Sequence, residues 1–193
     1  MCSEFPYEFI IQGIIMKDIN WWAQIIGVFG IICFVLSFQI KSNKALLVVQ
    51  AIADALFGIQ FILLGGYTGC FGMIIVVLRN IFIYFKERNN FFSFKGWKYV
   101  FIVLILISTI FTWDGIKSIL PFIACAGATY IYFENNARKY RTVNLFCASP
   151  CWLIYDLLVG SYAGALNEII TMISITVSII RFGWKSLGDN EFK

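Results

Sequence analysis

The sequence predicts an all-α integral membrane protein with seven transmembrane helices, arranged as two parallel three-helix repeats joined by a linker helix. Three observations predict this fold: the composition, a series of long apolar runs, and a turn sequence that occurs twice. Of the 193 residues, 60% are hydrophobic and only 13% are charged, whereas about 25% are charged in a typical soluble domain. A soluble core of this size cannot bury so much apolar surface, so most of the chain faces lipid.

Seven apolar runs have the length of a membrane-spanning helix, which takes roughly 17–25 residues. In lipid each backbone polar group must be satisfied within its own segment, so we expect helices rather than irregular chain. The expected helices are Trp21–Ile40, Ala45–Leu64, Gly69–Phe85, Trp97–Trp113, Ile116–Phe133, Val143–Val159 and Ala163–Phe182.

The basic residues between these runs predict the orientation. Twelve of the 15 lysines and arginines fall on one side of the expected membrane, after the first, third, fifth and seventh runs. Only Lys17 and Lys117 fall on the other side, and Arg79 lies inside the third run. Because basic loops stay in the cytoplasm, the N-terminus is expected outside and the C-terminus inside.

A repeated turn predicts an internal duplication. The sequence LGGYTG at Leu64–Gly69 returns as VGSYAG at Val159–Gly164, and a shift of 95 residues aligns 44–86 with 139–181 without a gap. The first bundle is then 21–85, the second is 116–182, and the odd spacer helix 97–113 gives both bundles the same orientation, as in parallel transporter repeats.

The two ends of the chain lie outside these bundles. Residues 1–20 carry Glu4 and Glu8 where a secretory signal needs positive charge. Their aromatic and aliphatic residues are consistent with an amphipathic helix on the outer surface, or with a loosely docked start. Residues 183–193 are expected to be a cytoplasmic tail.

Family resemblance rests mainly on the first half of the chain. The stretch LLGGYTGCFGMIIVVLRN, Leu63–Asn80, with its short turn and its Arg-Asn pair deep in the following helix, resembles the YgjV-type family of bacterial inner-membrane proteins. The 3+1+3 arrangement also resembles the SWEET sugar facilitators and, more loosely, the PnuC vitamin transporters. The SWEET resemblance implies helix-kinking prolines; Pro121 and Pro150 match them, but the first bundle has none.

Polar residues inside the first bundle are candidates for a solute site. Asp54 lies midway along its helix, Gln50 lies one turn earlier on the same face, and Arg79 and Asn80 lie at similar depth in the next helix. Intramembrane charges usually face a bundle interior or a cavity. We expect Arg79 within ion-pair reach of Asp54, either as part of a solute site or as a structural pair.

The second bundle offers Trp152 and Asp156, one turn apart, as an aromatic platform beside a hydrogen-bond acceptor. The alternative is that Trp152 is ordinary packing. Further polar candidates are Asn144, Ser149, Asn167 and Glu168, the last near enough to the outer turn to reach water.

Function is expected to be transport of a small polar solute (a sugar, nucleoside or vitamin-like molecule) by alternating access between the bundles. The alternative is a non-transporting membrane scaffold or stress-related protein of the same fold. No enzymatic constellation, cofactor motif or metal-ligand spacing is present, and the chain has no histidine. The aromatic and basic stretch NNFFSFKGWK fits lipid headgroups better than nucleic acid. The expected partners are the bilayer and one unidentified solute, with homo-oligomerisation left open.

Overall fold

The structure, a computed structural model, describes residues 20–37, 43–86, 90–94, 96–133 and 137–182. The expected outer N-terminal segment and cytoplasmic tail therefore lie outside the described residues, apart from Asn20. In the described part the chain is helical and contains no strand. The longer helices are α2 (Trp21–Ser37), α3 (Asn43–Leu64), α4 (Tyr67–Phe85), α6 (Trp97–Phe111), α7 (Ile119–Tyr132), α9 (Ser149–Val159) and α10 (Tyr162–Phe182).

Short elements extend these helices or connect them. Helix α5 (Asn90–Ser93) lies between α4 and α6, and a 3-10 turn, η1 (Ile116–Ser118), leads into α7. Helix α8 (Ala137–Val143) and a π-helical turn, η2 (Asn144–Ala148), run directly into α9. The stretch from Ala137 to Val159 is thus one helix with a local change of hydrogen-bond pattern.

Helix length bears directly on the expected spans. Two described helices, Tyr67–Phe85 and Arg141–Val159, are long and apolar enough to cross a bilayer. Five more apolar helices are shorter, at 10–17 residues: Trp21–Leu36, Val48–Leu64, Trp97–Phe111, Ile116–Tyr132 and Tyr162–Val177. Each of the seven apolar runs therefore forms a helix, and two of these helices have the length needed to cross a bilayer.

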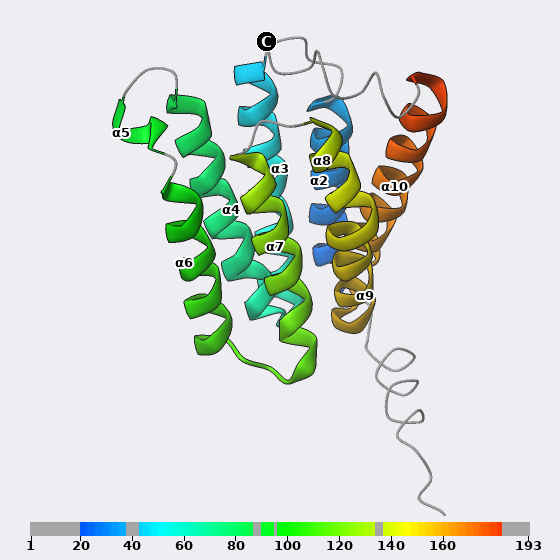
Figure 1. The fold of residues 1–193 in the computed structure, drawn as a ribbon. Coiled ribbons are helices and arrows are strands. Elements are labelled where there is room, and N and C mark those ends of the chain that lie inside the picture. The colour runs from blue at the N-terminus through cyan, green and yellow to red at the C-terminus, as the bar shows by residue number, and fades with distance from the viewer. Residues whose placement is uncertain (1–19, 38–42, 87–89, 95, 134–136, 183–193) are drawn as a thin grey trace, which may run out of the picture.

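The helices lie side by side, with the α6–α7 connection at one end and α5 at the other (Figure 1). Contacts follow a closed ring, in which each helix packs on the next: α2 on α3, α3 on α4, α4 on α7, α7 on α9, α9 on α10, and α10 back on α2. Helix α6 packs outside this ring, against α4 and α7.

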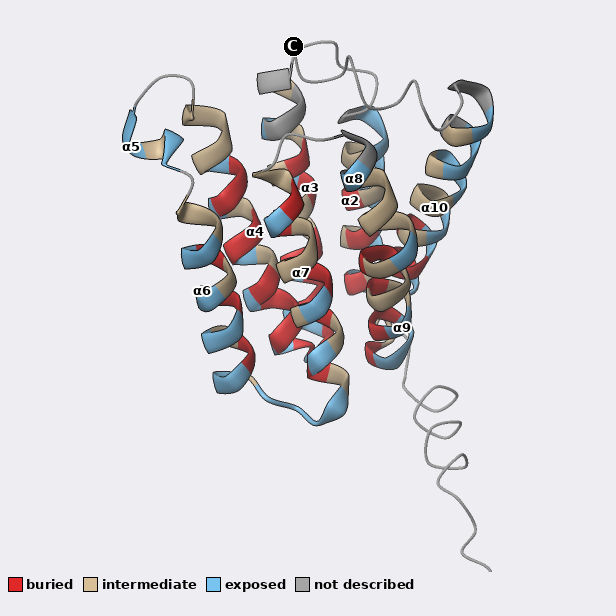
Figure 2. Ribbon diagram, viewed as in Figure 1, coloured by how far each residue is buried: buried red, intermediate tan, exposed pale blue. Residues whose placement is uncertain are grey.

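Burial follows the ring closely. Buried residues lie along the inward faces of the helices, and exposed residues lie along the outward faces (Figure 2). The exposed residues include many large apolar side chains, among them Ile52, Ile59, Ile110 and Ile173. A soluble monomer seldom exposes apolar patches of this extent, so the outer surface is suited to lipid.

The repeated turns have the same backbone geometry. Gly65 and Gly160 both have a left-handed backbone, with φ of 73° and 78°, which suits glycine because it lacks a Cβ. Hydrogen bonds run from Gly66 N to the Phe61 carbonyl and from Ser161 N to the Asp156 carbonyl, each at 2.8 Å. These two bonds are related by the 95-residue shift, so the repeated sequence forms a repeated structure.

The same shift relates whole elements. Adding 95 to the bounds of α2, 21–37, gives 116–132, which are the bounds of η1 together with α7. The shifted bounds of α3 are 138–159, against 137–159 for the α8–η2–α9 helix. The shifted bounds of α4 are 162–180, against 162–182 for α10.

Two seams close the ring near the turns, and each is held by polar contacts. We call the α2–α10 contact the first seam; there Gln24 Nε2 donates to the Gly160 carbonyl at 2.7 Å and Gln24 Oε1 accepts from Ala163 N at 3.0 Å. We call the α4–α7 contact the second seam; there Thr68 Oγ1 donates to the Thr112 carbonyl at 2.6 Å and lies 3.1 Å from Ser118 Oγ.

An aromatic group fixes the end of the molecule that carries α5. The ring of Phe82 on α4 makes edge contacts with Phe92, Trp97 and Phe101, at centroid distances of 4.8–5.1 Å. Phe91 and Phe94 remain exposed beside this group. The described part of the NNFFSFKGWK stretch therefore packs aromatic rings against α4 at this end of the molecule.

Candidate functional site in the ring interior

Gln50 and Asp54 lie on the inward face of α3, as the sequence predicts. Gln50 is buried, whereas Asp54 is half-buried even though Phe57 and Phe61, on the same side of the helix, are buried. The lipid side of α3 is formed by other residues, including Ile52 and Ile59. The carboxylate of Asp54 therefore points toward the ring interior.

Asn80 joins Asp54 to Arg79. Asn80 Nδ2 donates to Asp54 Oδ2 at 2.9 Å, while Asn80 Oδ1 accepts from Arg79 Nη2 at 3.0 Å and from Arg79 Nε at 3.3 Å. Within the described residues no direct ion pair links Arg79 and Asp54. A salt bridge does join Lys117 and Asp114, but these residues lie in the connection before α7. The expected pair is thus a three-residue relay, with the amide between the charges.

Arg79 also reaches across to α7. Its Nη1 donates to Thr129 Oγ1 at 3.3 Å, and its guanidinium lies 4.2 Å from the centre of the Tyr132 ring. The side chain is only 3% exposed. Because a buried guanidinium needs both hydrogen-bond acceptors and a negative or π-electron neighbour, this set of contacts stabilises Arg79 and ties α4 to α7.

Trp152 and Asp156 are both buried on the inward face of α9. Trp152 stacks on Phe61 of α3 at 5.6 Å between ring centres, and Tyr155 packs edge-on against both rings. The aromatic platform expected at Trp152 is therefore covered by Phe61. Sequence reasoning did not single out Phe61 or Tyr155, because neither carries a charge or a motif.

Tyr155 also makes a polar contact between the bundles. Its hydroxyl oxygen accepts from Gly69 N at 3.0 Å. A Cβ at Gly69 would stand 2.7 Å from the Tyr155 ring, so glycine is required for this approach. The aromatic group of Phe61, Trp152 and Tyr155 thus joins α3, α4 and α9 close to the first turn.

A second polar group lies where α9 and α10 meet. The side chain of Asp156 is 2% exposed, and a Cβ placed on Gly164 would stand 2.7 Å from both its carboxylate oxygens and still closer to Ser161 Oγ. One turn along the same face of α10, Asn167 Nδ2 donates to Glu168 Oε1 at 3.4 Å. Glu168 is half-buried and faces inward, rather than simply reaching water at the turn.

Several buried oxygens in this region have no hydrogen-bond partner. Among the described residues these are Gln50 Oε1, Gln60 Oε1, Asp156 Oδ1, Ser161 Oγ and Asn167 Oδ1. Buried polar atoms are nearly always paired, so these positions are suited to water or to a ligand.

Comparison with known proteins gives the same family as the turn and the Arg-Asn pair. The family described as bacterial inner membrane protein, Imp-YgjV, matches residues 21–186. The chain belongs to this family. It is 25% identical over 175 residues to the inner membrane protein YgjV of Escherichia coli (strain K12), covering 90% of this chain and 91% of that protein. No solved structure matches.

Membership of an Imp-YgjV family puts the described helices in a bacterial inner membrane. The inward position of Asp54, Arg79 and Asp156 then has a clear physical reason, since a charged side chain facing lipid is costly and one facing a protein interior can be hydrogen-bonded. The exposed outer faces (Figure 2) carry many large apolar side chains.

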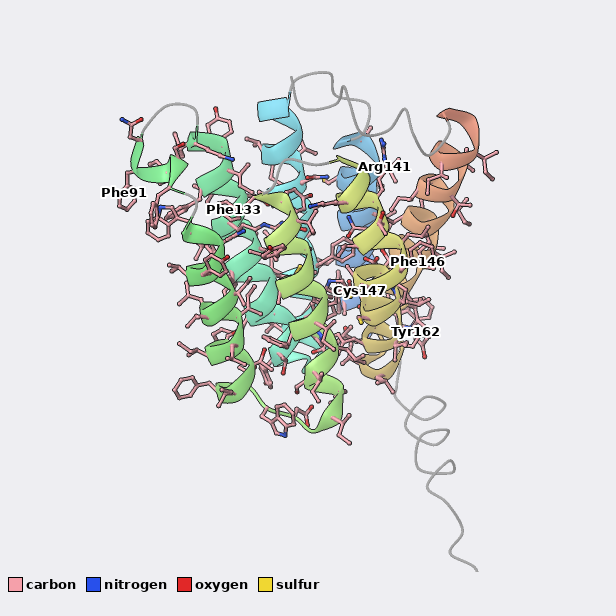
Figure 3. All side chains as sticks on the ribbon, in the orientation of Figure 1. Phe91, Phe133, Arg141, Phe146, Cys147 and Tyr162 are labelled. Carbon is pink, nitrogen blue, oxygen red and sulfur yellow. The ribbon has the colours of Figure 1, made fainter. Side chains whose placement is uncertain are left out.

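The π-helical turn η2 breaks the regularity of the second bundle in this Imp-YgjV chain. It ends immediately before Ser149 and Pro150, and Phe146 and Cys147 lie within it, between Arg141 and Tyr162 (Figure 3). Proline has no N–H to donate to the preceding turn, which favours the wider hydrogen-bond pattern. The related stretch of α3 has no proline and continues as an ordinary α-helix. π-turns are frequent at functional sites.

Proposed function

We propose that this protein is a transporter or facilitator of a small polar solute, which passes between two three-helix bundles by alternating access. In this proposal all seven apolar helices cross the membrane. The first bundle is α2–α4, the second runs from η1 through α10, and α6 is the linker. The bundles are parallel repeats related by a two-fold axis along the membrane normal.

The order of contacts round the ring supports this architecture. A two-fold axis that exchanges the bundles turns the α4–α7 contact into the α10–α2 contact, and both contacts are present. The matching element bounds and the matching turn hydrogen bonds support the same relation. A helix outside the duplication should pack asymmetrically, and α6 covers the second seam only.

The polar interior is the observation that carries the proposal. Asp54, Asp156 and Glu168 lie on inward faces of helices that belong to an inner-membrane protein. Two of these carboxylates are half-buried, and several nearby oxygens have no protein partner. Ionisable groups inside a membrane protein cost stability, and those that are present usually have a function. Binding a polar solute is a function that matches the position of these carboxylates.

Binding is tested first with the purified protein. A thermal-shift screen against sugars, nucleosides and vitamins identifies solutes that raise the melting temperature, and uptake into proteoliposomes then tests transport. Asp156→Asn keeps the shape of the side chain but removes its charge, so we expect uptake to fall about tenfold, the loss of one strong hydrogen bond. Asp114→Asn, in the exposed loop before η1, is the matched control and should leave uptake unchanged.

Orientation is tested with a reporter fused after Lys193. The basic residues predict a cytoplasmic C-terminus and an outer N-terminus. A reporter that becomes active only outside the cytoplasm contradicts this topology.

The alternative proposal is a membrane scaffold or stress-related protein with the same fold. The stacked rings of Phe61 and Trp152 favour it, because they fill the space between α3 and α9. A scaffold gives no solute-dependent shift in melting temperature and no uptake. In either case we expect no enzymatic activity and no binding of nucleic acid.

A further inference from the structure

Formal charge in the ring interior is unbalanced. Among the described residues the interior holds the carboxylates of Asp54, Asp156 and Glu168 and the guanidinium of Arg79. Arg79 is already committed to Asn80, Thr129 and the Tyr132 ring on the α4–α7 side. The carboxylates of α9 and α10 therefore have no cationic side chain as a partner in this part of the chain.

The carboxylates lie at successive depths. With a rise of 1.5 Å per residue, Asp156 is about 4 Å, Glu168 about 9 Å and Asp54 about 15 Å from the turn at the end of its own helix. Asp156 and Glu168 therefore lie about one turn apart in depth, whereas Asp54 lies deeper and accepts a hydrogen bond from Asn80 at 2.9 Å. Two carboxylates at neighbouring depths repel each other, and a cation between them relieves the repulsion.

The unpartnered atoms identify the kind of group that is missing. Asp156 Oδ1 and Asn167 Oδ1 are acceptors, and the orientation of the Asn167 amide is fixed by its own N–H bond to Glu168. Ser161 Oγ, which carries its own O–H donor, lies beside Asp156 over the Cα of Gly164, so the atoms that lack a donor are Asp156 Oδ1 and Asn167 Oδ1. All of these side chains except Glu168 are more than nine-tenths buried. The missing partner is thus a hydrogen-bond donor.

We propose that the ring interior binds a small protonated amine, with its ammonium group between Asp156 and Glu168, beside the Asn167 amide. An ammonium supplies three N–H donors and one positive charge. A resident metal ion fits less well, since the described residues contain no group of three Asp, Glu, His or Cys side chains that could hold one.

That the amine crosses the membrane rests on the proposed transport function. Binding of the amine, however, can be measured without transport. The melting temperature of the purified full chain is measured in propylammonium chloride and in sodium chloride at equal ionic strength. The uncharged isostere 1-propanol and the anionic isostere sodium butyrate, each at the same concentration, complete the series. We expect propylammonium alone to raise the melting temperature, by about 3–6 °C when it is at about ten times its Kd.

Substitutions then locate the binding. Glu168→Gln and Asp156→Asn should each remove most of the propylammonium shift, while Asp114→Asn, which loses the same charge from an exposed loop position, should retain it. If a variant fails to fold, the contrast between propylammonium and 1-propanol on the unaltered chain remains decisive.

Two results overturn the inference. One is an equal melting temperature in propylammonium, sodium and propanol, and the other is a propylammonium shift that survives both substitutions. If neutral solutes are taken up while amines give no shift, the amine inference fails and the transport proposal stands. If no solute of any charge binds or is taken up, both fail.

Discussion

The ring closes at two seams whose backbones are related by the 95-residue shift but whose side chains differ. At the first seam an amide, Gln24, contacts the second turn, and Gly27 lets α2 approach Ala163 of α10. At the second seam hydroxyl groups, those of Thr68 and Ser118, make the contact with the first turn. Outside the second seam lies α6, and no other described helix packs on the first seam in the same way.

The difference shows how a duplicated scaffold compensates for one unpaired helix. At the second seam α6 packs against both α4 and α7 and adds to the contacts that hold these two helices together, which include those of Thr68. The first seam has no such cover among the described residues, and there Gly27 of α2 lies directly against Ala163 of α10. A Cβ at Gly27 would stand 2.6 Å from the Cβ of Ala163 and from the Gln60 amide. Small residues at such positions are typical of helix pairs in membranes.

The largest effect is expected from Gly27→Ala, because the added methyl has no space at the first seam. Overpacking of this kind costs up to about 3 kcal/mol. Unfolding in a denaturing-detergent titration measures the loss. The control is Gly58→Ala, where the nearest contact would be Met73 Cβ at an ordinary 3.5 Å. Equal stability of the two variants contradicts the close approach at the first seam.

An intermediate effect is expected from Gln24→Leu. It removes both hydrogen bonds to the second turn and leaves the Gly160 carbonyl and the Ala163 N–H without their partner, which costs about 2 kcal/mol. At the second seam, Thr68→Val leaves a site that α6 still covers, and we expect about half of that loss. The same titration compares the two variants, and a larger loss for Thr68→Val would reverse our ranking of the seams.

The smallest effect is expected at the turns themselves. A Cβ at Gly65 meets no atom within 4 Å, so Gly65→Ala should cost only the strain of a left-handed backbone, about 1 kcal/mol. Gly65→Asn should recover part of this loss, because asparagine tolerates that conformation. The φ angles of the two turn glycines are nearly equal, so the backbone cost at Gly160 should be the same. A loss at Gly65 well above this value means that the turn has contacts beyond its backbone.

Much of this arrangement could be predicted from the sequence, because it depends on local patterns. Apolar runs predict the helices, and the repeated glycine turn predicts the left-handed backbone at Gly65 and Gly160. The inward position of Gln50, Asp54, Trp152 and Asp156 follows from helical spacing and from the cost of exposing charge to lipid.

The contacts between distant segments could not be predicted in the same way. Depth alone places Asp54 beside Arg79, but the insertion of Asn80 between them depends on the rotation of α4 about its axis. Likewise, the covering of Trp152 by Phe61 depends on how closely α3 approaches α9. Pro150 signals a break in its helix, yet whether that break becomes a kink or a π-turn depends on the neighbouring helices.

The hydrogen bonds of Gln24 have a consequence for biogenesis. Its partners, Gly160 and Ala163, are 136 and 139 residues further along the chain. At a synthesis rate of about 5–20 residues per second, Gln24 is made roughly 7–27 seconds before the second turn. Until then the Gln24 amide must be hydrated, or held by the insertion machinery or by Gln60 of α3, whose Nε2 lies 3.5 Å from Gln24 Oε1 in the closed ring. The ring can therefore close only at the end of translation, when the last helix brings the Gln24 partners into place.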